Sequence, residues 1–420
     1  MQTRRVVVTG LGAVSPVGNT AQSSWESVKS GKSGIARITH FDASELDVQI
    51  AGEVKGFDIT EYGVSERSMR KTARFSRFFL ASAIQAAKEA GLTKEVLSKA
   101  KSAVCSASCI GGFDIVEDSY KTLFDRSLGS SRLSSATVPM FIANEAASAV
   151  SIYFSLSGPS WTLSNACASG TDSLTLALDT IRSGRADIVF AGGTETPITK
   201  FTVAALSQLG ALARGFNDDA EKASRPFDRD RKGFVLSEGA AVLILEEEEH
   251  AKERGAKIYA EVLGAASSCD AYHIASPKKD GSGAAMAVRA AIEDAHIKTS
   301  DIQYYNAHGT GTIANDISET AMIKSVFGDY AKSLHISSTK GATGHLIGAS
   351  GALEALFCVK AIQDGFIPPT INLENPDIEN ALDLDYTAKQ GAECKISVAA
   401  SGSFGFGGQN SCIIFGAYNR

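Results

Sequence analysis

The stretch LSNACASGTDSLTLALDTIRSG, residues 163–184, places a cysteine among small residues directly before a helical pattern. Its apolar positions follow the i, i+3, i+4, i+7 spacing of one helix face: Leu174, Ala177, Leu178 and Ile181. We therefore predict a strand over WTLSN (161–165), a helix over residues 170–183 and a stop at Gly184. With the buried strand predicted over ADIVFAGG (186–193), the segment is a strand–helix–strand unit of a parallel or mixed sheet.

A second segment further along the chain repeats this pattern. ASGALEALFCVKAIQDG (349–365) opens with the same Ala-Ser-Gly as ASGTDSLTLALDTIRSG (168–184), and both have Ile and Gly at matching positions near the end. Its apolar face has the same phase: Ala355, Cys358, Val359 and Ile362. It also follows a predicted strand, LHISST (334–339). The two segments together indicate an internal duplication.

At 420 residues the chain is longer than one typical domain, so we expect two domains or two fused halves. The duplicated segments favour two halves, which we place at residues 1–255 and 256–420. The boundary lies in EEEEHAKERGAK (246–257), which we interpret as a charged, surface-facing helical segment. The four glutamates of this segment are then a solvated face.

Composition and charge argue against several classes of protein. A net charge of −6 does not favour nucleic acid as a partner, and no run of 18 apolar residues could span a membrane. Glycines and a proline interrupt the apolar N-terminus, so we predict a buried first strand over Val6–Thr9 and a loop, not a signal peptide. Seven cysteines without a CxxC pair indicate reduced thiols in the cytoplasm, not disulfides or a zinc site.

Cys167 is the first candidate for chemistry, because it lies at the predicted turn from strand to helix. Unpaired N–H groups and the helix dipole favour an anion there, so we expect the pKa of this thiol to be lowered. The small residues around it allow a sharp turn. A buried structural cysteine is the alternative, and the turn favours a nucleophile. The other six cysteines are interpreted as core or incidental residues.

Two histidines lie in glycine-rich loops between a predicted strand and a predicted helix. NAHGTGTIANDISET contains His308, and STKGATGHLIGASG contains His345 with Lys340 five residues earlier. Sites in open α/β sheets form at this end of the strands, and related halves would let the second loop face Cys167. A core histidine bonded to backbone is the alternative for His308. Glu354 follows in the predicted helix and could anchor Lys340 or be exposed.

The C-terminal segment SGSFGFGGQNSCIIFG surrounds Phe406 with three glycines. This pattern suits a gate over a pocket, and its exposed N–H groups could bind an oxyanion. A plain turn packed by two phenylalanines is the alternative. The sequence contains no metal-ligand spacing such as HExxH, no P-loop and no dinucleotide fingerprint after a strand.

Several longer motifs resemble those of β-ketoacyl-acyl-carrier-protein synthases of the thiolase-like superfamily. They keep the family's order from RRVVVTGLGAVSPVG (4–18) to NSCIIFG (410–416), nearly the whole chain. The specific ones are GPSWTLSNACASG, ASRPFDRDRKGFVLSEGA, NAHGTGT, STKGATGHLIGASGALE and SGSFGFGGQN. The resemblance implies an α/β fold with five layers, αβαβα, built from two similar halves.

The resemblance also implies roles for the candidate residues. Cys167 is the acyl-accepting nucleophile, and His308 and His345 are the histidine pair of the elongating condensing enzymes. Lys340 and Glu354 are their supporting residues. The acyl group on the cysteine is attacked by the carbanion that forms when malonyl-carrier protein loses carbon dioxide, and two neutral histidines can stabilise the enolate.

Substrate contacts follow from the same resemblance. The N–H groups of Cys167 and Phe406 form the oxyanion hole, and Phe406 is the gate. The implied substrate-binding residues are Thr310 and Thr312 in the phosphopantetheine tunnel, Ile110 in the acyl pocket near the dimer interface, and Phe404. The family is dimeric and uses neither a metal nor an organic cofactor, because its substrates arrive as phosphopantetheine thioesters on acyl carrier protein.

The branch of the family is a finer question. NDDAEKASRPFD, ETPIT and NAHGTGTIANDISET are closer to catalytic subunits of type II polyketide synthases than to fatty-acid elongation enzymes. We therefore lean to a polyketide or polyene ketosynthase, either a homodimer or a heterodimer with a chain-length-factor-like homologue. Two other functions stay open: a non-catalytic partner subunit, against which Cys167 argues, and a cysteine acyl hydrolase. The primer and the product length are not set by the sequence.

A basic segment, SERSMRKTAR (65–74), stands out in this acidic chain. Its charges follow helical spacing: Arg67, Arg70, Lys71 and Arg74. We predict that they form one helical face that attracts an acidic carrier protein. An ordinary solvated face is the alternative.

Overall fold

The computed structural model describes residues 4–125 and 132–418. The strands are β1 (Val6–Val14), β2 (Ala36–Arg37), β3 (Ile50–Ala51), β4 (Ser102–Ala107), β5 (Ser160–Leu163), β6 (Ile188–Glu195), β7 (Gly239–Glu247), β8 (Ala260–Cys269), β9 (Tyr304–Asn306), β10 (His335–Ser337), β11 (Phe366–Ile367), β12 (Ala392–Glu393), β13 (Val398–Gly405) and β14 (Gln409–Gly416). The α-helices are α1 (Ala21–Lys29), α2 (Glu66–Met69), α3 (Arg74–Glu89), α4 (Lys94–Lys99), α5 (Phe113–Phe124), α6 (Thr137–Phe141), α7 (Glu145–Phe154), α8 (Ser169–Arg182), α9 (Lys200–Gln208), α10 (Glu248–Glu253), α11 (Ser282–Asp294), α12 (Ile313–Phe327), α13 (Lys340–Thr343) and α14 (Ser350–Asp364).

One mixed sheet of ten strands runs through the molecule in the order β10-β9-β13-β14-β8-β1-β7-β6-β4-β5. Its two ends have the same topology. Numbered in chain order, the five N-terminal strands lie side by side as first, fifth, fourth, second and third, and the five C-terminal strands have the same arrangement. The two first strands, β1 and β8, pair with each other in the middle of the sheet. This repeated topology agrees with the duplication predicted from the two Ala-Ser-Gly segments.

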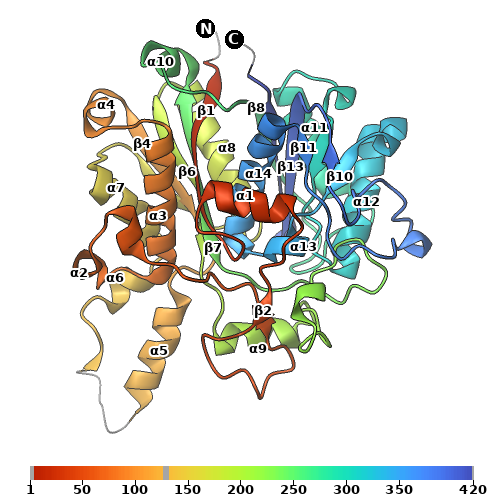
Figure 1. Cartoon of the computed structure of the whole chain (residues 1–420), viewed down its shortest axis with the longest axis horizontal. Helices are drawn as coiled ribbons and strands as arrows, with labels where there is room; N and C mark the ends of the chain where they lie inside the picture. Colours follow the sequence, from red (N-terminus) through yellow and green to blue (C-terminus); the bar gives the residue numbers. More distant parts are fainter. Residues whose placement is uncertain (1–3, 126–131, 419–420) are drawn as a thin grey trace.

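Helices cover and separate the two halves of the sheet, which gives the five-layered α/β fold that we predicted (Figure 1). Val189 and Leu243 face the central core with α8 and α14, whereas their strand neighbours Phe190 and Val242 face the outer core with α3. In the C-terminal half, Ile414 faces a third core under α11 and α12. This alternation is what a sheet buried on both faces requires.

The predicted helices of the two repeats agree with the structure to within a residue, but the first strand is longer than predicted. It covers Val6–Val14 instead of Val6–Thr9. We interpreted Gly10 and Gly12 as loop residues, yet they lie where α3 crosses the strand. A Cβ atom at either glycine would come within 2.1 Å of a carbonyl oxygen of α3. The glycines therefore allow close packing of helix on strand and do not end the strand.

The interpretation of the four glutamates at 246–249 as a solvated face was wrong for three of them. Glu246 and Glu247 end β7, and both are buried, as is Glu248. The Glu246 carboxylate accepts hydrogen bonds from Thr9 and from Arg254, at 2.6–2.8 Å. The Glu246 charge is buried because Thr9, distant in sequence, and Arg254, in the same segment, both donate to it.

None of the helices within residues 4–125 and 132–418 has both the length and the apolar character that a bilayer span requires.

Candidate active site

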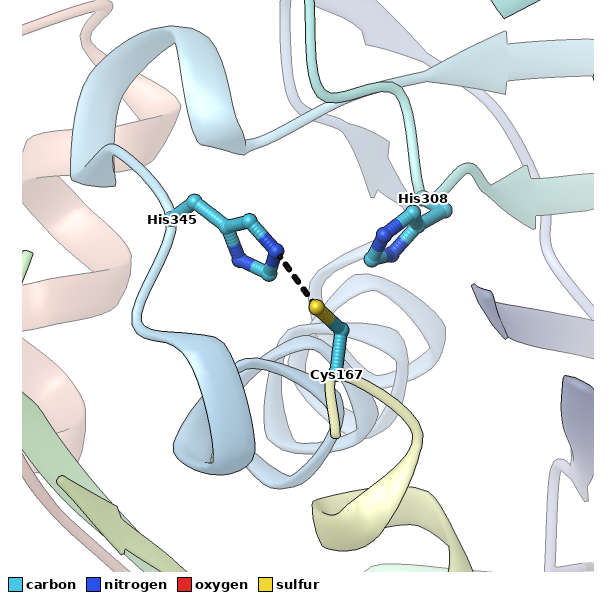
Figure 2. Close-up of side chains that lie close together, drawn as sticks. All are labelled: Cys167, His308 and His345. Carbon is cyan, nitrogen blue, oxygen red and sulfur yellow. Dashed lines mark hydrogen bonds between the residues drawn. The ribbon is translucent and has the colours of Figure 1, made fainter. Parts of the chain in front are cut away.

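The three candidate residues meet at the centre of the molecule, between the two repeated helices. Cys167 lies in the turn before α8, His345 in the loop between α13 and α14, and His308 just after β9. Figure 2 shows both imidazoles directed at the sulfur. His345 Nε2 lies 3.1 Å from Cys167 Sγ, and the two histidine ring centroids are 5.2 Å apart. The structure thus brings together residues separated by up to 178 positions in sequence.

The repeated Ala-Ser-Gly motifs explain why this meeting is possible. A Cβ atom at Gly170 would lie 2.7 Å from the backbone nitrogen of Ala352, and one at Gly351 would lie 2.7 Å from the backbone nitrogen of Thr171. Only glycine lets the first turns of α8 and α14 approach this closely. The duplicated motif therefore places Cys167 of the first half beside the His345 loop of the second.

The turn that carries Cys167 is strained. Ala166 has a φ of +47°, a conformation that residues other than glycine seldom adopt. Ser169 supports the turn, because its hydroxyl accepts the Asn165 N–H at 2.7 Å and donates to the Ala166 carbonyl at 2.6 Å. Strain held by surrounding contacts is common at reactive positions.

The environment of the thiol differs from our expectation. Burial raises the pKa of Cys167 to about 12, whereas we predicted that the helix N-terminus would lower it. The positive charge of Lys340 and the N–H of Phe406, which hydrogen-bonds the sulfur, both act in the opposite direction but do not outweigh desolvation. The resting sulfur is a thiol, so the geometry requires a base, and His345 is at hydrogen-bond distance.

His345 is held as a neutral ring. Burial, reinforced by the charge of Lys340, holds its pKa well below the usual range. Its Nδ1 lies 2.9 Å from the hydroxyl of Ser350, which also accepts the N–H of Leu346. The ring packs edge-on against Phe234, with centroids 5.1 Å apart. These contacts fix the ring with Nε2 directed at the sulfur.

His308 is neutral for the same reasons, since burial, Lys340 and His345 lower its pKa. The Lys340 ammonium lies 3.3 Å from His308 Nδ1 and contacts the carboxylate of Glu354, so Glu354 is an anchor of Lys340 and is not exposed. Burial raises the pKa of Glu354 to about 7, while the contact with Lys340 opposes this.

A cavity of about 640 Å³ opens onto the three residues. Every predicted substrate-binding or gating side chain lines it: Ile110, Thr310, Thr312, Phe404 and Phe406. Phe406 is 37% exposed, and the two glycines after it have φ values of +79° and +74°. The predicted residues therefore share one pocket, with Lys340 and Glu354 behind His308.

The predicted basic face is only partly present. Arg67, Arg70 and Lys71 are exposed, but α2 ends at Met69 and α3 begins at Arg74. The prediction of one continuous helix was therefore wrong. Arg74 lies apart from the other three, because its guanidinium pairs with the buried Glu238 at 2.7 Å and lies over the ring of Phe78.

The sequence analysis missed two buried carboxylates beside the site. Glu319 accepts the N–H groups of His308 and Gly309, both at 2.7 Å, and so holds the His308 loop. Glu195, at the end of β6, accepts N–H groups from two separate loops around the pocket. A carboxylate directly after a buried strand, as at Glu195, was the available signal.

The Cys167, His308 and His345 ligand atoms lie within 4.8 Å of one another, close enough to share a metal ion. Each atom is nevertheless accounted for by acyl-transfer chemistry: a nucleophile, its base and a second imidazole donor. The geometry defines the class as a cysteine acyltransferase with two histidines.

The comparisons with known proteins agree with this class. The family description "Beta-ketoacyl synthase, N-terminal domain" matches residues 3–251, and "Beta-ketoacyl synthase, C-terminal domain" matches residues 259–374. The chain is 44% identical to 3-oxoacyl-[acyl-carrier-protein] synthase 2 of Synechocystis over 418 residues, covering 100% of this chain and 99% of the relative. The protein of the same name from Vibrio harveyi is 44% identical over 99% of both chains.

Solved structures give the same picture. The ketosynthase in a type II PKS acyl-carrier protein complex bound to a hexaketide has a TM-score of 0.91 at 34% identity and covers both chains fully. The ishigamide ketosynthase/chain length factor has a TM-score of 0.92 at 32% identity and covers 99% of this chain and 100% of that chain. The chain belongs to the beta-ketoacyl synthase family, has the thiolase-like fold, and is a condensing enzyme of the acyltransferase type.

Proposed function

We propose that Cys167, His308 and His345 carry out the decarboxylative condensation of this family on two thioesters delivered by an acyl carrier protein. The observation that supports this most is the joint geometry: a thiol 3.1 Å from one neutral imidazole, with a second neutral imidazole facing the same cavity. The curated relatives carry the acyl-carrier protein in their name, and one structural neighbour was solved with such a protein.

In the first half-reaction, His345 Nε2 accepts the thiol proton as Cys167 Sγ attacks the acyl thioester carbonyl. The N–H groups of Cys167 and Phe406 are the proposed donors to the oxyanion, and the Phe406 N–H hydrogen-bonds the sulfur in the resting protein, which supports its part in this role. Collapse of the tetrahedral intermediate expels the phosphopantetheine thiolate, which takes up the proton. The acyl group then stays on Cys167 and extends along the pocket wall that includes Ile110.

In the second half-reaction, malonyl thioester loses carbon dioxide and leaves an enolate. His308 and His345 donate hydrogen bonds to the enolate oxygen as neutral rings, which avoids placing a full charge in a buried pocket. For this step His345 is in the tautomer with its proton on Nε2, and its Nδ1 accepts from the Ser350 hydroxyl. The enolate carbon attacks the acyl-Cys167 carbonyl, the C–S bond breaks, and the Cys167 thiolate takes up a proton from solvent. Thr310 and Thr312 line the side of the cavity assigned to the pantetheine arm.

The pathway is a finer part of the proposal. The relatives at 44% identity are named 3-oxoacyl-[acyl-carrier-protein] synthase 2, whereas the ketosynthase of the type II PKS complex and the ishigamide ketosynthase/chain length factor have 34% and 32% identity. The lean toward polyketide synthesis therefore has the weaker support, and fatty-acid elongation the stronger. We also propose that no metal or organic cofactor takes part, that the halves divide at residue 255, and that the seven free cysteines reflect a cytoplasmic location.

We propose a dimer, with a second copy or with a chain-length-factor-like homologue. Strand β5 is the last strand of the sheet, so one of its edges is unpaired among the described residues. Ile152 of the adjacent α7 is 79% exposed, and Tyr153 beside it is 38% exposed. An open strand edge with apolar neighbours is suited to pairing with another chain. Arg67, Arg70 and Lys71 are the proposed contacts for the acidic carrier protein.

Incubation with acyl- and malonyl-carrier proteins, with and without a candidate partner subunit, tests this proposal. Mass analysis should find a 3-oxoacyl product two carbons longer than the primer and one carbon dioxide per condensation. Free fatty acid released without malonyl-carrier protein would instead indicate the hydrolase. A chain that condenses only when the partner is present would favour the heterodimer.

A further inference from the structure

Glu195 is a buried carboxylate that the mechanism above does not use. It ends β6 and is fully shielded from solvent. One of its oxygens accepts the Ser108 hydroxyl at 2.8 Å and the Ile110 N–H at 3.2 Å. The other accepts the Cys109 N–H at 2.8 Å and the Gly348 N–H at 3.1 Å. Four hydrogen-bond donors of the protein therefore converge on the Glu195 carboxylate.

The donors come from two loops that belong to different halves of the molecule. Cys109 and Ile110 follow β4 and line the acyl side of the cavity. Gly348 follows His345 by three residues in the same loop, and a Cβ atom there would lie 2.6 Å from the Glu195 carboxylate and 3.0 Å from the Cys109 sulfur. Glu195 therefore joins the acyl-pocket wall to the loop that carries the histidine.

Both loops connect to strained backbone beside the reacting groups. Ile347, next to Gly348, has a φ of +48°, which a β-branched residue adopts only under constraint. On the other side, the Cys109 thiol donates to the carbonyl of Ala166 at 3.0 Å, and Ala166 is the strained residue before Cys167. Such conformations persist only where surrounding contacts fix them.

We propose that Glu195 is a positioning residue for the condensing reaction, because through Cys109 and Gly348 it fixes the two strained turns that aim Cys167 and His345 at each other. The Cys109 thiol is part of this arrangement and is not an incidental cysteine. Glu195 touches neither the sulfur nor the imidazole, so its action is through the backbone. The proposal rests on the proposed roles of Cys167 and His345.

The test is Glu195→Gln, read as the rate of Cys167 alkylation by iodoacetamide at pH 8, with peptide mass mapping to identify the alkylated cysteine. The amide NH₂ group of the glutamine would face backbone N–H groups that a carboxylate oxygen accepts in the wild type, so the loops should separate and the sulfur should lose its contact with His345. We expect the rate of Cys167 alkylation to fall at least 10-fold, because the thiol loses the base that accepts its proton. Acyl loading at neutral pH should fall at least 10-fold.

Glu246→Gln is the matched control, because Glu246 is equally buried and hydrogen-bonded but lies outside the cavity. The Glu246→Gln variant should have a lower melting temperature and an unchanged rate of Cys167 alkylation. If Glu195→Gln does not fold, Ser108→Ala removes one of the four donors and should lower the alkylation rate in the same direction. An unchanged alkylation rate in a folded Glu195→Gln or Ser108→Ala variant would overturn the proposal. Alkylation needs no acyl or malonyl substrate, so this outcome is independent of whether condensation is the activity.

Discussion

The Lys340 ammonium lies 3.3 Å from Nδ1 of His308, and both side chains are buried. An ammonium group can only donate, so Nδ1 is the acceptor and the ring proton is on Nε2. The same positive charge acts together with burial to keep the His308 pKa low. The contact therefore selects one tautomer of a neutral ring, with an N–H that can donate to an enolate oxygen.

Lys340→Met removes the ammonium group that selects the His308 tautomer with its proton on Nε2. Without the ammonium, Nδ1 can carry the proton, and Nε2 then becomes an acceptor that cannot stabilise an enolate. Release of carbon dioxide from malonyl-carrier protein should fall by about 10²-fold, the lower end of the range for a lost oxyanion donor. The measurement is carbon dioxide release under single-turnover conditions. Decarboxylation at the wild-type rate would show that His308 does not depend on Lys340.

The low pKa of His308 predicts that the free energy of unfolding depends on pH. In the unfolded chain this histidine gains a proton below about pH 6.5, whereas in the folded chain it stays neutral. The unfolded state then binds more protons, so the free energy of unfolding falls as the pH drops below about 6.5.

His308→Gln should remove this contribution, which has a slope of up to about 1.4 kcal/mol per pH unit. Urea unfolding of both proteins at pH 7 and pH 5.5 measures the difference, and groups common to both, including Glu319 and Glu354, cancel. Equal pH dependence in the two proteins would mean that His308 has the same pKa in the folded and unfolded states.

Ile110→Phe tests the depth of the acyl pocket. Ile110 lines the cavity, and its N–H is fixed by Glu195, so added bulk is not accommodated by movement of the backbone. The phenyl ring would therefore take up cavity volume that a long acyl chain needs. Long acyl primers should load more slowly by intact mass, short primers nearly normally, and Ile110→Val should load both. Equal loading of long and short primers by the Phe variant would place Ile110 away from the acyl chain.

Reversal of the exposed basic residues tests carrier-protein docking. Arg67, Arg70 and Lys71 changed together to Glu should raise the apparent KM for carrier-protein substrates at low salt and leave kcat nearly unchanged. A second triple variant at Lys94, Arg185 and Lys332, which are exposed residues before β4, β6 and β10, matches the charge change. Identical kinetics in both triple variants would show that the first set is an ordinary solvated face.

The sequence predicted the parts of this molecule that depend on local pattern. Helical periodicity located α8 and α14, and glycine-rich loops after strands singled out His308 and His345. Family resemblance supplied the gate and pocket positions, all of which line one cavity. Each of these features could be predicted because its sequence pattern lies within one short segment of the chain.

The errors arose where the outcome depends on residues far away in the chain. The prediction of a lowered Cys167 pKa was wrong because desolvation by the surrounding fold outweighs the effect of the helix N-terminus. Glu246 was taken as solvated because one of its partners, Thr9, lies 237 residues away in the chain. Glu195 was missed because its donors come from two loops in different halves.

The central claim is that loading requires Cys167, decarboxylation requires His308, and His345 serves both steps. Parallel measurement of acyl-enzyme mass and carbon dioxide release tests it most directly. Cys167→Ala should abolish acyl loading and condensation but retain malonyl decarboxylation. His308→Ala and His345→Ala should lower decarboxylation by about 10²–10³-fold, with a smaller effect on loading for His308→Ala. Wild-type decarboxylation in both histidine variants, or acyl loading that survives in Cys167→Ala, would contradict the account.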